Sequence, residues 1–168
     1  MIIEGEEVQS NIPTETPQVG TLLRTIDDYI TFEKSVTVPY IWAEDSNFYP
    51  IFYEPNVKCF LIEARERHGT ASTSGTVTVE KLANGVARGA GGSMLASTFD
   101  LAFPANTTYL RGPTTILAGT NLNPGDAIAL RAGGTLTNQR NVTVTCLLGI
   151  NMSNIPSGQS VSSVISGL

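Results

Sequence analysis

Residues 122–148 read LNPGDAIALRAGGTLTNQRNVTVTCLL, and this stretch decides the fold class. In Asn123-Pro124-Gly125-Asp126, proline takes the second and glycine the third position of a tight turn. This turn opens an apolar strand from Ala127 to Ala132, and Gly133-Gly134 turns the chain again. Asn141 to Leu148 then alternates apolar side chains with threonines, the period of a strand with one buried face. The stretch therefore predicts antiparallel β-structure.

Short strands of the same kind are expected along most of the chain, separated by Gly, Pro and Asn. Asn84-Gly85 predicts a hairpin turn with two residues at positive φ. The glycine-rich segment 89–92 is expected to be a flexible loop. Seven or eight short strands with no long helix between them predict an all-β chain, an antiparallel β-sandwich of the jelly-roll or immunoglobulin type. The further expected strands are Thr31 to Val38, Asn56 to Ala64, Gly75 to Leu82, Ser93 to Phe103, Tyr109 to Arg111 and Thr114 to Ala118.

The chain divides by composition into an arm, a sandwich and a tail. Residues 1–30 are acidic and contain Pro13 and Pro17, which predicts an extended N-terminal arm, with a short helix possible from Thr21 to Ile30. Residues 31–150 hold the strand signals and form the expected sandwich. Residues 151–168 are rich in Ser and Gly, which is typical of a flexible C-terminal tail.

The charge distribution bears on the class of partner. Residues 1–66 contain twelve Asp or Glu and four Lys or Arg, a net charge of −8, whereas residues 67–168 contain three and six, a net charge of +3. The absence of a basic run argues against nucleic acid as the partner. Without an apolar stretch of about 18 residues or a signal sequence, we expect a chain made in the cytoplasm that does not span a membrane.

The residues that could carry chemistry are few. His68 is the single histidine, which excludes a multi-histidine metal site, and we expect it to be a solvated loop residue. The close carboxylate pairs lack the spacing of a calcium loop, so solvated turns or interface contacts are favoured for them. Cys59 and Cys146 are expected to be buried free thiols. The sequence therefore predicts no catalytic residue, no metal site and no cofactor. The carboxylate pairs are Asp27-Asp28, Glu44-Asp45 and Glu63 with Glu66.

An aromatic block lies between residues 40 and 53 and holds six of the twelve aromatic residues of the chain. Aromatic side chains fill the ends of sandwiches, anchor protein interfaces and stack on sugars. Core filling, a subunit interface and a ligand cleft therefore all stay open for this block. Its members are Tyr40, Trp42, Phe48, Tyr49, Phe52 and Tyr53.

Three stretches carry a resemblance to a known class of proteins: residues 57–85 (VKCFLIEARERHGTASTSGTVTVEKLANG), residues 99–113 (FDLAFPANTTYLRGP) and the opening stretch 122–148. Together they resemble the jelly-roll modules of tailed-bacteriophage virion proteins, in particular head decoration (cement) proteins and head fibres. The resemblance spans a little over half of the chain. It implies a homotrimer located on the capsid surface of the virion, whose N-terminal arms bind the major capsid protein.

Two functional hypotheses follow from these features. The first is a non-enzymatic capsid decoration protein that stabilises the shell, and the second is a receptor- or glycan-binding domain of a phage fibre or tail protein. In the second, Tyr40, Trp42, Tyr49 and Tyr53 would form the platform for a sugar ring. The candidate partner-binding residues are Ile2, Ile3, Ile12 and Val19 in the arm, and Tyr40, Trp42, Phe48, Tyr49 and Tyr53 in the aromatic block.

Overall fold

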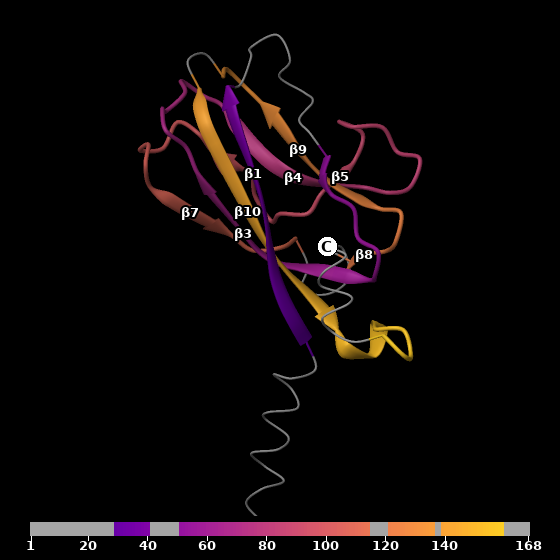
Figure 1. Cartoon of the computed structure of the whole chain (residues 1–168). Coiled ribbons are helices and arrows are strands. Elements are labelled where there is room, and N and C mark those ends of the chain that lie inside the picture. The colour runs from indigo at the N-terminus through magenta and orange to yellow at the C-terminus, as the bar shows by residue number, and fades with distance from the viewer. Residues whose placement is uncertain (1–28, 41–50, 115–120, 137–138, 160–168) are drawn as a thin grey trace, which may run out of the picture.

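The protein is a sandwich of two antiparallel sheets, seen in a computed structural model that describes residues 29–40, 51–114, 121–136 and 139–159 (Figure 1). A short 3-10 helix, η2 (Met152–Asn154), follows the last strand. The strands are β1 (Tyr29–Tyr40), β2 (Ile51–Tyr53), β3 (Cys59–Arg67), β4 (Thr76–Leu82), β5 (Gly92–Ser93), β6 (Phe99–Asp100), β7 (Thr108–Arg111), β8 (Asn121–Leu122), β9 (Ala127–Gly133) and β10 (Arg140–Asn151).

The order of the strands is that of a jelly roll. One sheet has the order β1-β10-β3-β7, with β8 also paired to β3, and the other has the order β2-β9-β4-β5, with β6 also paired to β4. The first strand thus pairs with the last (β1 with β10) and the second with the last but one (β2 with β9). Inside these two pairs, β3 pairs with β7 and β4 pairs with β5. This nested antiparallel pairing confirms the jelly-roll prediction and excludes the immunoglobulin alternative.

The core lies between the sheets and is built from alternate residues of their strands. On β10, Val142, Val144, Cys146 and Leu148 are buried, as the alternation in the sequence predicts, while the threonines between them face outward. Strand β9 contributes Ile128, Leu130 and Ala132 from the opposite sheet. Both cysteines are buried and free, as predicted.

A β-bulge changes which residues of β3 face the core. Leu147 of β10 pairs with Glu63, but Leu148 pairs with Leu61, so Ile62 is an extra residue on β3. Because side chains alternate along a strand, one extra residue exchanges the two faces. Cys59 and Leu61 point inward before the bulge, and Ala64 and Glu66 do so after it.

The outer face of the β2-β9-β4-β5 sheet is covered by the loop between β4 and β5. Beneath this loop, Leu82, Ala127 and Ala129 form a second apolar cluster outside the main core. The loop is fixed by Glu80, which is fully buried and accepts a hydrogen bond from the Gly89 backbone nitrogen at 2.9 Å. The segment predicted as a flexible glycine loop, 89–92, thus has one hydrogen bond to a buried carboxylate, and Gly92 begins β5.

Several predicted boundaries need correction. Tyr29 and Ile30 belong to β1, so the predicted helix does not reach Ile30, and its remaining residues lie outside the described chain. The strand expected from Ser93 to Phe103 is two short strands, β5 and β6, that pair with different parts of β4. The strand expected from Thr114 to Ala118 falls almost wholly outside the described residues.

Two further expectations, on a turn and on the tail, also change. After β4, only Gly85 of the Asn84-Gly85 pair has a positive φ, 85°, so the turn is not the predicted two-residue hairpin. Within the region predicted as the tail, Asn151 belongs to β10 and Ile155 packs against the core, and residues 160–168 lie outside the described chain.

Candidate functional site: an open sheet face and a buried polar cluster

The structure describes few of the predicted partner-binding residues. Ile2, Ile3, Ile12 and Val19 of the arm lie outside the described residues, as do Trp42, Phe48 and Tyr49 of the aromatic block. For Tyr40 the backbone is described, and it pairs with Arg140 at the end of β1.

Tyr53, at the end of β2, is part of the core. Its side chain is 5% exposed, and its ring packs edge-on against Phe32 with centroids 5.7 Å apart. The Lys34 ammonium lies 5.3 Å from the centre of the same ring. Burial, together with the neighbouring Cys59 thiol, raises the pKa of the Tyr53 phenol. Of the three roles left open for the aromatic block, Tyr53 takes core filling, and its ring is not available to a ligand or a partner.

The β1-β10-β3-β7 sheet presents an outer face that no described segment covers. Hydroxyl groups line it and bond across strands: Ser35 to Thr145 at 2.7 Å, and Thr37 to Thr143 at 2.9 Å. These cross-strand bonds fix side-chain rotamers on the surface. On β7, Leu110 extends this face and is 54% exposed. We call this surface the open face.

The positive and negative charges of the open face are equal in number, and most of them form ion pairs with one another. Arg65 bonds to Glu33 at 3.2 Å and to Glu63 at 2.5 Å. With Arg67 added, the face has two carboxylates and two guanidinium groups, which sum to zero. A depression of about 350 Å³ lies among them and is bordered by the threonines of β7 and β10. The open face is therefore polar but electrically neutral, which suits contact with another protein surface.

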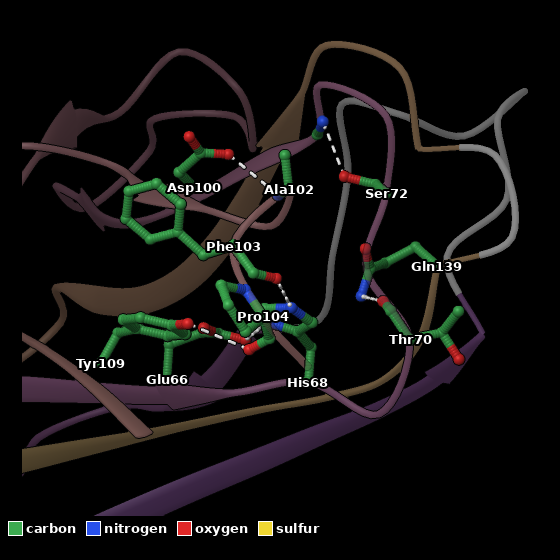
Figure 2. Close-up of polar contacts among 11 residues, drawn as sticks. Glu66, His68, Thr70, Ser72, Asp100, Ala102, Phe103, Pro104, Tyr109 and Gln139 are labelled. Atoms are coloured by element: carbon green, nitrogen blue, oxygen red, sulfur yellow. Dashed lines mark hydrogen bonds and ion pairs between the residues drawn. The ribbon is translucent and has the colours of Figure 1, made fainter. Parts of the chain in front are cut away.

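His68, immediately after β3, is fully buried, which corrects the expectation of a solvated loop residue. One ring nitrogen, Nδ1, lies 3.0 Å from Oε1 of Glu66, and the other, Nε2, lies 2.9 Å from the carbonyl oxygen of Phe103. The ring of Tyr109 stacks on the imidazole with centroids 6.2 Å apart. Figure 2 shows His68 enclosed by these groups. The imidazole is shielded from solvent, so it cannot act as a base on an external substrate.

Glu66 shares this burial, which corrects the expectation of a solvated carboxylate. Its side chain is fully buried, and its second oxygen, Oε2, has no hydrogen-bond partner among the described residues. Burial raises the pKa of Glu66, although the hydrogen bond and charge of His68, and the charge of Arg111, act in the opposite direction. We refer to Glu66 and His68 together as the buried pair.

A signal for the buried pair was present in the sequence. In Arg65-Glu66-Arg67-His68, the two arginines occupy alternate positions, so a strand that exposes them must point Glu66 and His68 inward. The bulge that sets this phase carries no glycine, and nothing in the sequence near Ile62 indicated it.

The described part of the chain holds no group of three or more His, Cys, Asp or Glu side chains that could bind a metal ion. It also holds no helix long and apolar enough to cross a membrane.

Comparison with known proteins identifies no family. No family model matches the chain, and no curated protein matches it. Among solved structures, it is 13% identical to a chain of the Cyanophage Pam1 capsid asymmetric unit, over 73% of this chain and 85% of that one, with a TM-score of 0.41. It is 11% identical to a chain of the capsid of Ralstonia phage GP4, over 79% and 86%, with a TM-score of 0.45. At such identities and TM-scores, these likenesses carry no argument about function.

Proposed function

We propose that this chain is a non-enzymatic structural protein of a virion, a decoration protein that binds the capsid surface and stabilises the shell. The single observation that carries the proposal is the contrast between the two faces of the jelly roll. One face is covered by the chain's own loop over Glu80, whereas the open face is left uncovered by every described segment. A neutral, hydroxyl-lined face of this extent is suited to a protein neighbour.

In this proposal the sandwich forms a homotrimer through the open face, and the arm of each subunit binds the major capsid protein. Because the charges on the open face sum to zero, a second copy of the chain meets no net repulsion there. Three linked arms raise the effective concentration of each arm for its own site, so binding is strong even when each single contact is weak. The acidic, proline-containing sequence of residues 1–30 fits such an arm.

The alternative, a glycan-binding domain built on the aromatic block, is weakened by Tyr53. A sugar platform needs exposed rings, and this member of the block is in the core. No described residue favours the alternative in its place.

The test combines oligomeric state with co-sedimentation on empty capsids of the virus that carries the gene. The full chain should be a trimer in light scattering and should co-sediment. Deletion of residues 1–20 should leave the trimer intact and abolish co-sedimentation. If the shortened chain binds capsids as well as the full chain does, the arm is not the contact.

A matched pair of substitutions tests the open face. Leu110→Arg places a charge on the open face, and Val86→Arg places the same charge at a site of similar chemistry, 38% exposed, on the loop that covers the other sheet. Leu110→Arg should give monomers, and Val86→Arg should leave the trimer unchanged. Trimers in both variants would contradict the role of the open face.

A further inference from the structure

The hydrogen bonds of the buried pair define how many protons it holds. The carbonyl oxygen of Phe103 can only accept, so Nε2 of His68 must carry a hydrogen to bond with it at 2.9 Å. The 3.0 Å contact between Nδ1 and Oε1 of Glu66 also requires one hydrogen between the two atoms. Either a neutral carboxyl donates to Nδ1, or an imidazolium donates to a carboxylate. Both arrangements contain the same single proton and have the same total charge of zero.

We propose that Glu66 and His68 share one proton in the folded protein across the neutral pH range, and that this proton locks the loop between β6 and β7 onto the end of β3. Without the proton, the lone pair of Nδ1 would face a buried carboxylate. With a second proton, the pair would hold an uncompensated positive charge away from water. Both states are costly in a site that is fully buried.

The start of the loop is held by Leu101, which bonds to the backbone of Ser72 and Gly75, whereas residues 103–106 are attached through His68 and through β7. The backbone carbonyl of His68 accepts a hydrogen bond from the Asn106 nitrogen at 2.7 Å, and its ring bonds to Phe103. The Tyr109 hydroxyl donates to the carbonyl of Pro104 at 3.0 Å while its ring stacks on His68 (Figure 2). Displacement of the imidazole would break its bond to Phe103 and its stacking on Tyr109, and so loosen the residue 103–106 segment that these contacts hold beside the His68 backbone.

The other ionisable groups around the buried pair have bonds of their own. The Tyr109 hydroxyl binds Pro104, and Arg111 of β7 donates to the carbonyls of Thr98 and Leu110. Asp100 of β6 accepts from the Ala102 nitrogen at 2.9 Å. On β10, the carbonyl oxygen of Arg140 accepts a hydrogen bond from the Gly69 backbone nitrogen. Burial raises the pKa of the Cys146 thiol, which is therefore neutral. None of these bonds supplies a proton to Nδ1, so Glu66 is the partner in the exchange.

The proton count sets the sign of the pH dependence. In an unfolded chain, carboxyl and imidazole groups titrate near about pH 4.3 and 6.5. Above about pH 6.5 the two unfolded groups hold no proton while the folded pair holds one, so stability falls as pH rises. Below about pH 4.3 the unfolded groups hold two protons and the folded pair one, so stability falls as pH falls. Between these limits the pair adds no slope.

Glu66→Gln is the decisive variant, because a glutamine amide can donate to Nδ1 with no shared proton. Its unfolding equilibrium constant, measured by urea titration between pH 7.5 and 8.5, where the unfolded imidazole is already neutral, should gain almost no pH dependence from this site. The constant of the wild type should rise relative to that of the variant by up to about tenfold per pH unit, the value for one proton. Parallel pH profiles would overturn the proposal. Asp100→Asn, at the end of β6 where this loop begins, should keep the wild-type slope.

Nuclear magnetic resonance tests the proton directly, even if the variant does not fold. The chain has one histidine, so its imidazole signals need no assignment. We expect hydrogen on Nε2 and constant ring signals from pH 5 to pH 8. Signals that titrate through this range, or a ring with hydrogen on Nδ1 alone, would refute the shared proton.

Hydrogen exchange tests the lock on the loop. In Glu66→Ala, protection of the Asn106 amide should fall, whereas that of Asp126, whose amide bonds to Asn123 at 2.9 Å in a different turn, should not. Unchanged protection at Asn106 would show that the loop does not depend on the pair.

Discussion

Replacement of Cys146 by serine tests how dry the core is around β10. Cys146 is fully buried, lies opposite Ala64 on β3, and has Val144 and Leu148 as its inward neighbours on the same strand. Serine nearly preserves the volume of cysteine, but its hydroxyl would find no partner among these apolar groups. An unpaired buried hydroxyl costs about 1–3 kcal/mol. Alanine removes only the sulfur atom, a loss comparable to that of one methylene, about 1 kcal/mol.

We therefore expect Cys146→Ser to be less stable than Cys146→Ala by about 1 kcal/mol or more, although serine is closer in shape to cysteine. Urea unfolding followed by far-ultraviolet circular dichroism measures both. With a slope of about 2 kcal/mol per molar urea, the serine variant should unfold at a midpoint about 0.5 M or more below that of the alanine variant. If the serine variant is equal or more stable, a polar group or water reaches Cys146, and the argument for a dry core at this position fails.

Three further predictions concern other parts of the sandwich. Burial raises the pKa of Cys59 and of Cys146 to about 12, so at pH 8 neither thiol should react with Ellman's reagent in the folded protein, while both react in denaturant. Gly91→Ala should lower the free energy of unfolding by about 1–3 kcal/mol in urea titrations, because the added Cβ would meet the Lys81 carbonyl and lie 2.8 Å from Leu82 Cδ2. The control is Gly92→Ala, which has open space at its Cβ and should lower the free energy of unfolding by less than about 0.5 kcal/mol. Burial disfavours the ionised form of Asp126, but bonds from Asn123 and Lys81 outweigh it and lower its pKa, so this residue contributes stability above about pH 3.9 that is lost as pH falls further. Asp126→Asn should therefore destabilise the protein at pH 7, and its urea midpoint should approach that of the wild type at pH 3; an equal difference at both pH values would contradict the role of the charge.

The parts of the fold that were predictable are those in which local sequence decides burial. Alternation from Val142 to Leu148 predicted the inward face of β10 correctly, because apolar residues at every second position indicate a strand with one face buried in the core. The turn before β9 was equally clear, since proline and glycine fix its backbone: Gly125 has a φ of 91°, and the Asp126 nitrogen bonds to the Asn123 carbonyl.

The parts that were missed depend on contacts between distant segments. Asn84-Gly85 is a strong hairpin signal, yet the chain instead folds back over β4, because buried Glu80 binds Gly89 and an apolar cluster lies beneath. Likewise, a continuous strand was expected from Ser93 to Phe103, but the ladder with β4 is interrupted: Met94 still bonds to Val79 of β4, whereas Leu95 bridges to Pro113 instead. Burial of an apolar residue outside a strand leaves no periodic trace.

The bulge in β3 connects the fold to both candidate sites. Without the extra residue at Ile62, continued alternation from Cys59 and Leu61 would point Glu63, Arg65 and Arg67 into the core and would turn Glu66 outward. With it, Arg65 reaches Glu33 on the open face, and Glu66 and His68 enter the end of the sandwich together. The same local shift therefore balances the charges outside and assembles the buried pair inside. Burial of Glu66 without His68 would remove the hydrogen-bond partner of its Oε1 and leave Arg111 as the remaining nearby charge. His68, which we expected to be solvated, is therefore the residue that supplies the hydrogen bond for this buried carboxyl group.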